Sequence, residues 1–172
     1  MPKAPRRLQD LRRRMYPKAK SARTPRFWGI VVPVAKPDTL AAASQQAKRN
    51  GGAPGLDGQP FADIEAAGRD HFLAASREEL LAGPSHPHPP RVVESPKGDD
   101  QVRQLQLPCR RDRVVPGALK LILEAIFEAD CGPNPYGYRP QRSPHQALAG
   151  VRRRLRRRRS TVIEVELARY FD

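Results

Sequence analysis

The sequence predicts an α+β fold, composed of helices, one short antiparallel hairpin and a terminal strand. Apolar residues recur at helical spacing in residues 110–130 and 144–159. Two short segments that mix apolar and polar residues, 91–94 and 102–107, flank a polar turn that contains glycine, which is the pattern of a hairpin. Within the predicted strand of residues 162–171, apolar and acidic side chains alternate over residues 163–167, which is typical of a strand with one buried face.

The first segment of the chain is strongly basic. Residues 1–37 form a predicted N-terminal arm, in which Leu8, Leu11 and Met15 place a short helix over residues 8–16. Such a helix suits a phosphate or membrane surface, and a solvated arm is the alternative. Residues 27–34 are apolar but bracketed by prolines, so we expect a short strand or loop there.

Two helices are predicted before the hairpin. Asp38 is the expected N-cap of a helix over residues 39–49, which Asn50-Gly51-Gly52 ends because these residues tolerate positive φ. Residues 53–58 read as a tight turn. A second helix is expected over residues 63–81, before Gly83-Pro84 terminates it.

The predicted hairpin carries two basic side chains. Lys97 lies at its turn and Arg103 on its return strand. Both would project from the hairpin, where such a pair can bind a triphosphate or a nucleic-acid backbone. Ordinary surface charge is the alternative interpretation.

Residues 110–130 contain the strongest helical pattern in the chain. One apolar stripe is predicted to face the core, formed by Val115, Leu119, Ile122, Leu123, Ile126 and Phe127. Pro116-Gly117 lies within this segment, so the helix either begins there or begins at Arg110 and accommodates a proline at a cost of about 3 kcal/mol.

A basic loop and a basic helix follow. Residues 131–143 combine aromatic side chains with arginine, including Tyr138, Arg139 and Arg142, which suits stacking on bases and contacts with phosphates. Ser143 should cap a helix over residues 144–159, with Pro144 at its first position. We expect its three spaced apolar side chains, Leu148, Val151 and Leu155, to face inward. Seven of the eight residues 152–159 are arginine, and they repel one another unless an anion lies alongside.

The terminal segment would place two acidic side chains on one face of a strand, along one edge of a sheet. Glu164 and Glu166 would lie roughly 7 Å apart, close enough to share a metal ion or an arginine. Alternatively, they only offset the neighbouring arginines. The chain stops soon after this strand, so we expect an interrupted domain.

Composition favours a polyanionic partner. The 172 residues carry a formal charge of +14 with a pI near 10.8, and the arginines are clustered. Cys109 and Cys131 show no zinc-ligand or disulfide spacing, and we expect no metal binding by His86 and His88 in their proline-rich loop. With no apolar run near the ~18 residues of a membrane span, we expect a soluble cytoplasmic protein without a membrane partner.

Five short sequence motifs, taken together, resemble those of a known family. They are KRNGGAPGLDG (48–58), Pro96-Lys97 with Arg103, RDRVV (111–115), the stretch 123–130 with Ile126-Phe127-Glu128, and YGYRP (136–140) with Arg142-Ser143. In this order and spacing they resemble the N-terminal half of the reverse transcriptase/maturase proteins encoded by bacterial group II introns. Retron-type reverse transcriptases are more loosely similar. The resemblance covers residues 47–172.

The resemblance implies a partial reverse transcriptase domain over residues 38–172, made of the fingers and the first palm strand. It places Lys97 and Arg103 near the phosphates of the incoming nucleotide. It also places the loop around Tyr138, Arg139 and Arg142 near the template, and we add Arg152, Arg153 and Arg156 as expected RNA contacts.

By the same resemblance, the terminal strand matches a motif that binds two catalytic Mg²⁺ ions. Glu166 holds the place of its aspartate, the Leu167 carbonyl would be a second metal ligand, and Phe171 would screen the sugar of the incoming nucleotide. Glutamate is longer than aspartate, and a misplacement of about 1 Å can cost roughly a hundredfold in rate. The family's second carboxylate strand would lie beyond Asp172.

We therefore expect a truncated RNA-directed DNA polymerase fragment that is inactive alone. Two alternatives remain: a module that binds intron RNA or other RNA through the fingers, and one half of a split enzyme completed by a downstream palm and thumb polypeptide. The expected partners are RNA, with a DNA primer and dNTP if synthesis occurs. Mg²⁺ is implied by the family, although its binding by this fragment is in doubt.

Overall fold

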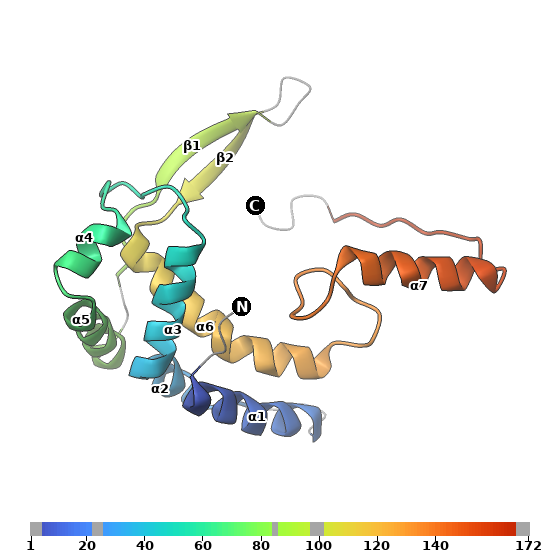
Figure 1. Ribbon diagram of the computed structural model, residues 1–172, viewed down its shortest axis with the longest axis horizontal. Helices are drawn as coiled ribbons and strands as arrows, with labels where there is room; N and C mark the ends of the chain where they lie inside the picture. The colour runs from blue at the N-terminus through green and yellow to red at the C-terminus, as the bar shows by residue number, and fades with distance from the viewer. Residues whose placement is uncertain (1–4, 22–25, 84–85, 97–101, 168–172) are drawn as a thin grey trace. The chain divides into compact units, whose positions relative to one another are not determined.

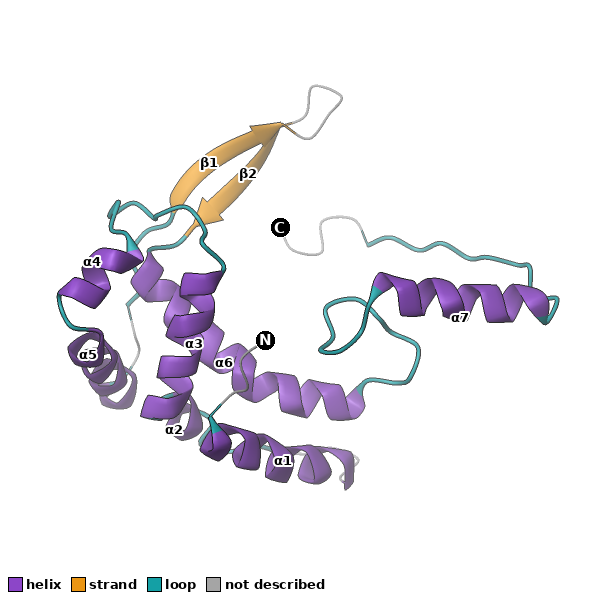
Figure 2. Ribbon diagram, in the orientation of Figure 1, coloured by secondary structure: helices purple, strands orange, loops and turns teal. Residues whose placement is uncertain are grey.

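The fold is α+β, as predicted. The computed structural model describes residues 5–21, 26–83, 86–96 and 102–167. It divides into two compact units, Met1–Asp130 and Cys131–Asp172, which are described separately. Figure 2 shows helices throughout and one two-stranded antiparallel hairpin. No helix of the described residues is long and apolar enough to cross a membrane.

The first unit contains six of the described helices and the hairpin. They are α1 (Arg6–Ser21), α2 (Val31–Val34), α3 (Pro37–Arg49), α4 (Phe61–Ala66), α5 (Arg69–Ala82), β1 (Arg91–Pro96), β2 (Val102–Leu107) and α6 (Arg110–Asp130). The second unit contains α7 (Pro144–Arg156).

Helix α6 is the centre of the first unit, and α1 and α3 both pack along it (Figure 1). Its buried face consists of Val114, Ala118, Ile122, Ala125, Ile126 and Ala129. Of the six residues predicted to face the core, Ile122 and Ile126 are buried and Val115 and Leu123 are half-buried. Leu119 and Phe127 do not face the core, because they are 40% and 62% exposed. Small side chains let the neighbouring helices approach closely, so the buried face follows the alanines rather than the largest residues.

Helix α6 begins at Arg110, so Pro116 lies inside it. Proline has no N–H to donate to the carbonyl four residues earlier, which is that of Asp112. The following Gly117 faces α3, where a Cβ would lie 3.4 Å from that of Ala43. Pro116 is thus exposed, whereas the next residue of the helix, Gly117, allows the close approach to α3.

The basic N-terminal segment forms a longer helix than the predicted residues 8–16, and it packs on the core. Leu8 and Ala19 of α1 are only 2% and 1% exposed. Arg12 pairs with Glu124 of α6, and Lys20 Nζ donates a hydrogen bond to the Ala129 carbonyl at 3.1 Å. The predicted domain boundary at residue 37 stays a prediction.

Three local expectations in the first unit are wrong in whole or in part. Of the expected strand or loop over residues 27–34, residues 27–30 have no helix or strand, but residues 31–34 form the short helix α2. Helix α3 begins at Pro37 after Lys36 as N-cap, so Asp38 lies in its first turn instead of capping it. The single helix expected over residues 63–81 is two helices, because Gly68 takes φ of +103° between α4 and α5. Glycine adopts this conformation without the steric penalty of a Cβ.

The hairpin agrees with prediction. β1 and β2 pair antiparallel, with Val93 opposite Leu105 and Ser95 opposite Arg103. Its strands pack chiefly on one another in the described part of the chain, and Figure 1 shows the hairpin projecting from the helices near the start of α6. Lys97 and the rest of the turn lie outside the described residues.

The start of α7 also agrees with prediction. The Ser143 side chain accepts a hydrogen bond from the Gln146 N–H, and the Gln146 side chain accepts one from the Ser143 N–H, which completes a capping box. Pro144 occupies the first turn, where a missing N–H is tolerated. The helix ends at Arg156, three residues before the predicted end.

Two expectations about the second unit are wrong. Leu148, Val151 and Leu155 do not face inward, because each is at least half exposed. Residues 160–167 form no strand, and all of them are exposed. A strand needs a neighbour to satisfy its backbone N–H and C=O groups, and the one sheet of the described residues is the hairpin. Residues 168–171 of the predicted strand lie outside the described residues.

Candidate nucleic-acid interface

The second unit contains a pocket of about 220 Å³ lined mainly by arginine. Its lining consists of Asn134, Tyr136, Gly150, Arg153, Arg154, Arg157 and Arg159. We call these seven residues the arginine pocket. Four guanidinium groups around one small space form an arrangement suited to a bound anion.

The helical repeat of α7 brings one wall of the arginine pocket together. Gly150, Arg153, Arg154 and Arg157 follow the spacing i, i+3, i+4 and i+7, so they share one side of the helix. Gly150 is the buried residue of α7, and a Cβ there would lie 3.2 Å from the Tyr136 hydroxyl. The absence of a side chain at this position leaves the space open.

The fourth arginine comes from the turn that ends α7. The Arg158 N–H bonds the Leu155 carbonyl at 2.9 Å, and the Arg159 N–H bonds the Arg154 carbonyl at 3.1 Å. This is the Schellman pattern, in which the penultimate residue takes a left-handed conformation. Arg158 does so with φ of +59°, and the chain reverses so that Arg159 lines the pocket.

The loop before α7 supplies the opposite wall. Arg154 Nη2 donates to the Asn134 Oδ1 at 2.7 Å, which joins loop and helix. Arg139 donates from Nη1 to the Gly132 carbonyl at 2.6 Å and to the Pro135 carbonyl at 2.9 Å. Arg139 therefore holds the shape of the loop that carries Asn134 and Tyr136.

No acidic residue occurs in residues 131–159, whereas nine arginines do. The arginine pocket thus has no carboxylate of its own segment to balance its charge. Like charges held at this density repel one another, and a bound phosphate would reverse that effect by giving each guanidinium an acceptor.

The RNA contacts predicted from sequence fall at different places. Arg153 lines the pocket, whereas Arg152 and Arg156 are exposed on α7 outside its lining. Arg142 lies over the Tyr136 ring, 5.7 Å from its centroid, and Tyr138 is fully exposed with φ of +56°. Sequence reasoning marked residues 131–143 as a basic aromatic loop and residues 152–159 as an arginine run, but it did not name Gly150 or single out Asn134, Tyr136, Arg154, Arg157 and Arg159 as individual contacts. The helical spacing of residues 150, 153, 154 and 157 is the signal that could have found most of them.

Of the three residues predicted to contact the nucleotide, only Arg103 lies in the described part of the chain. Arg103 is exposed on β2. Lys97 and Phe171 lie outside the described residues. These roles stay predictions.

The predicted Mg²⁺ ligands, Glu166 and the Leu167 carbonyl, belong to no cluster of three metal-ligating side chains in the described residues, and their roles stay predictions. Glu166 and Leu167 are exposed in a segment without regular secondary structure. Across residues 5–21, 26–83, 86–96 and 102–167, one group of three side chains could hold a metal ion, and it does not include Glu166. Mg²⁺ in polymerase sites requires carboxylates held together, and the described part of this segment does not bring such a set of side chains together.

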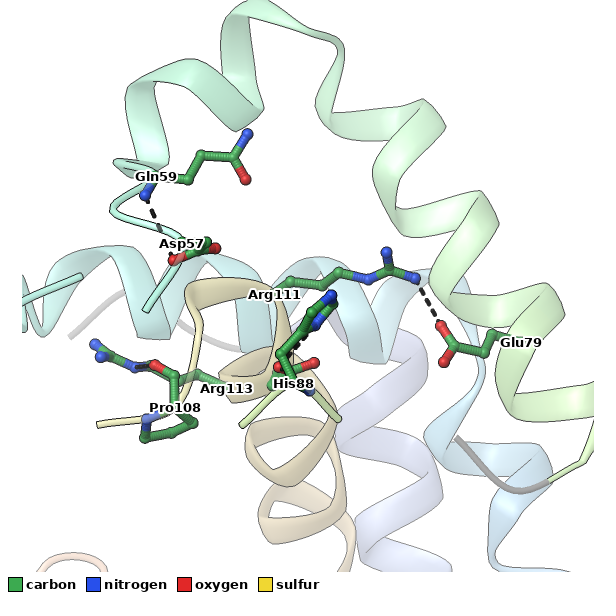
Figure 3. Close-up of polar contacts among 8 residues, drawn as sticks. Asp57, Gln59, Glu79, His88, Pro108, Arg111 and Arg113 are labelled. Atoms are coloured by element: carbon green, nitrogen blue, oxygen red, sulfur yellow. Dashed lines mark hydrogen bonds and ion pairs between the residues drawn. The ribbon is translucent and has the colours of Figure 1, made fainter. Parts of the chain in front are cut away.

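Two of the sequence motifs that carry the family resemblance contact each other in the structure. Arg113 Nε donates to the Pro108 carbonyl at 3.0 Å, as Figure 3 shows, and its Nη2 donates to the Ala53 carbonyl. Gly55 is buried, and a Cβ there would lie 2.5 Å from the Cys109 Cα. The glycine-rich turn of residues 51–58 is thus fixed against the start of α6.

Comparisons with known proteins agree with the coarser part of the resemblance. No protein-family model matches the chain. It is 37% identical over 145 residues to Protein YkfC of Escherichia coli (strain K12), which covers 81% of this chain and 38% of YkfC. It is 34% identical over 77 residues to Group II intron-encoded protein LtrA of Lactococcus lactis subsp. cremoris, which covers 44% of this chain and 13% of LtrA. The chain therefore spans well under half the length of either relative.

Proposed function

We propose that this chain is a fragment related to the reverse transcriptase/maturase proteins of group II introns, and that its second unit binds RNA. The partial similarity to a group II intron-encoded protein supports the relationship. The arginine pocket, with four arginines and no acid in its segment, is the observation that carries RNA binding.

The chemistry of the second unit suits a single RNA strand. Guanidinium groups bind phosphate oxygens through paired N–H donors, and the arginine pocket offers four of them. Tyr138 presents a fully exposed ring on the loop before α7, where an unpaired base could stack. Phosphate contacts with one stacking ring give binding with little sequence preference.

Salt dependence is the direct test of this proposal. For single strands the slope of log affinity against log salt is about −0.7 for each phosphate neutralised. Because the arginine pocket has room for one phosphate, its share of the slope for a short single-stranded RNA should be about −0.7. Fluorescence anisotropy across a series of salt concentrations measures it.

A pair of double variants assigns the effect to the arginine pocket. Arg153→Gln/Arg157→Gln should reduce the magnitude of the slope by about 0.7, the share of the phosphate in the pocket. The matched control Arg69→Gln/Arg77→Gln removes the same charge from exposed positions on α5 and should leave the slope near that of the unmodified chain. Equal slopes for the two double variants, or a flat salt dependence in the unmodified chain, would refute RNA binding at the pocket.

DNA synthesis is expected only under the alternative in which this chain is one half of a split enzyme. A split enzyme would need a downstream palm and thumb polypeptide to supply the carboxylates that the described residues do not gather around Glu166. Primer extension on an RNA template with dNTPs and Mg²⁺, with and without such a polypeptide, distinguishes a partner-dependent polymerase from an RNA-binding fragment.

A further inference from the structure

A group of three metal-ligating side chains lies at the start of α6, in the first unit. The ligand atoms of His88, Cys109 and Asp112 all lie within 4.8 Å of one another. We propose that this group is a binding site for a divalent transition metal of the zinc class. The proposal is independent of RNA binding, because it concerns other residues and another unit.

The ligand types and their spacing suit such an ion. Imidazole nitrogen, thiolate sulfur and carboxylate oxygen are the ligands of Zn²⁺, at about 2.0 to 2.3 Å. Tetrahedral bonds of that length set neighbouring ligand atoms about 3.3 to 3.8 Å apart. His88 Nδ1 and Asp112 Oδ2 are already 3.2 Å apart, so only the cysteine sulfur has to move closer.

The local charges also fit. A neutral imidazole, a thiolate and a carboxylate together carry two negative charges, which balance a divalent ion. The three neighbouring guanidinium groups each have a partner elsewhere: Arg110 lies over the Phe61 ring, Arg111 bonds Glu79, and Arg113 donates to the Pro108 and Ala53 carbonyls. Figure 3 shows Arg111 reaching away to Glu79 while His88 lies beside the first turn of α6.

Protein contacts hold two of the ligands in position, and one side of the site is open. Asp112 Oδ2 accepts a hydrogen bond from the His88 backbone N–H at 2.9 Å, which fixes the loop that carries the imidazole. Cys109 is 2% exposed, and its backbone packs on Gly55. The His88 side chain is 55% exposed, so a metal ion has a path of entry and a water can occupy the fourth position.

The site lies where the hairpin joins the helices. His88 is three residues before the start of β1 at Arg91, and Cys109 is two residues after the end of β2 at Leu107. Because the described strands pack chiefly on each other, these two base segments fix the hairpin to the first unit. A metal ion bound to both segments and to Asp112 would clamp the base of the hairpin that carries Arg103.

Cobalt substitution tests the site on the full chain. Co²⁺ added under reducing conditions should bind at one equivalent and give the near-ultraviolet sulfur-to-cobalt charge-transfer band of a thiolate ligand, and Zn²⁺ should displace it. Cys109→Ser should abolish the band, whereas Cys131→Ser, at the other cysteine of the chain, should retain it. Absence of the band from the unmodified chain, or its loss in Cys131→Ser instead, would overturn the proposal.

A second pair of variants avoids the buried cysteine. His88→Gln alters a half-exposed side chain and should weaken Zn²⁺ binding at least tenfold in competition with a chromophoric chelator. His86→Gln, two residues earlier in the same exposed loop, should bind Zn²⁺ like the unmodified chain. Zn²⁺ should also raise the melting temperature of His86→Gln more than that of His88→Gln. Equal affinity and equal stabilisation in the two variants would refute a role for His88.

Discussion

Filling the arginine pocket without changing its charge tests whether RNA depends on the pocket or only on net charge. Gly150 is buried within α7, where a Cβ would meet the Tyr136 hydroxyl at 3.2 Å and Arg154 Nη1 at 3.4 Å. Both are the ends of flexible side chains, so a Cβ can be accommodated. The longer side chain of Gly150→Leu would extend into the pocket and occupy the place of a phosphate.

The expected magnitude follows from losing one phosphate position. Hydrogen bonds to a charged group contribute about 1.5 to 3 kcal/mol, so RNA affinity should fall about 10- to 150-fold. The salt slope should become shallower by about 0.7. Leucine has a helix propensity better than glycine by roughly 0.8 kcal/mol, so α7 should not lose stability.

Fluorescence anisotropy with a single-stranded RNA measures both quantities, and circular dichroism checks that the helix is retained. The matched control is Ala149→Leu, which adds side-chain volume to the neighbouring exposed position of α7. It should bind RNA like the unmodified chain. If Gly150→Leu and Ala149→Leu bind RNA within twofold of each other with the same slope, the pocket does not hold a phosphate.

Three further predictions concern stability and activity. Gly55→Ala should destabilise the first unit by about 2 to 4 kcal/mol in urea unfolding, because its Cβ would lie 2.5 and 2.6 Å from Cys109 backbone atoms, whereas Gly132→Ala, with nothing within 4 Å, should be neutral. Arg158→Gly should raise the melting temperature of α7 by relieving a left-handed residue, worth about 1 kcal/mol, and an unchanged or lower value would contradict the Schellman assignment. The chain alone should not extend a primed RNA template with Mg²⁺ and dNTPs, even as the Glu166→Asp variant. Any extension product would show that the chain forms a catalytic site that the described residues do not include.

Local features of the chain were predictable where the interaction itself is local. Ser143 caps α7 because its side chain bonds an N–H three residues later, and that bond depends on few other residues. The hairpin was predictable for the same reason, since alternation over residues 102–107 and a polar turn both act within one short segment. The glycine end of α3 belongs to this class, with Gly51 at φ of +60°.

Features that depend on packing partners were not predictable in the same way. Helical spacing in α6 placed Leu119 and Phe127 in the predicted apolar stripe, but the buried face of the helix includes Ala118, Ala125 and Ala129 instead. Gly55 likewise gives no sequence signal that its backbone lies against Cys109. The group of His88, Cys109 and Asp112 was missed because its ligands come from two segments on either side of the hairpin, with no metal-binding spacing.

Helix α7 shows that helical spacing alone does not tell which side of a helix another element covers. Leu148, Val151 and Leu155 recur at helical spacing, and this pattern says only that they share a side, not that another element covers it. Gly150, Arg153, Arg154 and Arg157 have the same spacing on another side, and there the loop of Asn134 and Tyr136 does provide a covering wall. What closes the arginine pocket is thus a bond outside the helix, from Arg154 to Asn134. Arg154→Gln should therefore impair RNA binding more than Arg156→Gln, although both remove one charge from α7, because only the first also frees the loop.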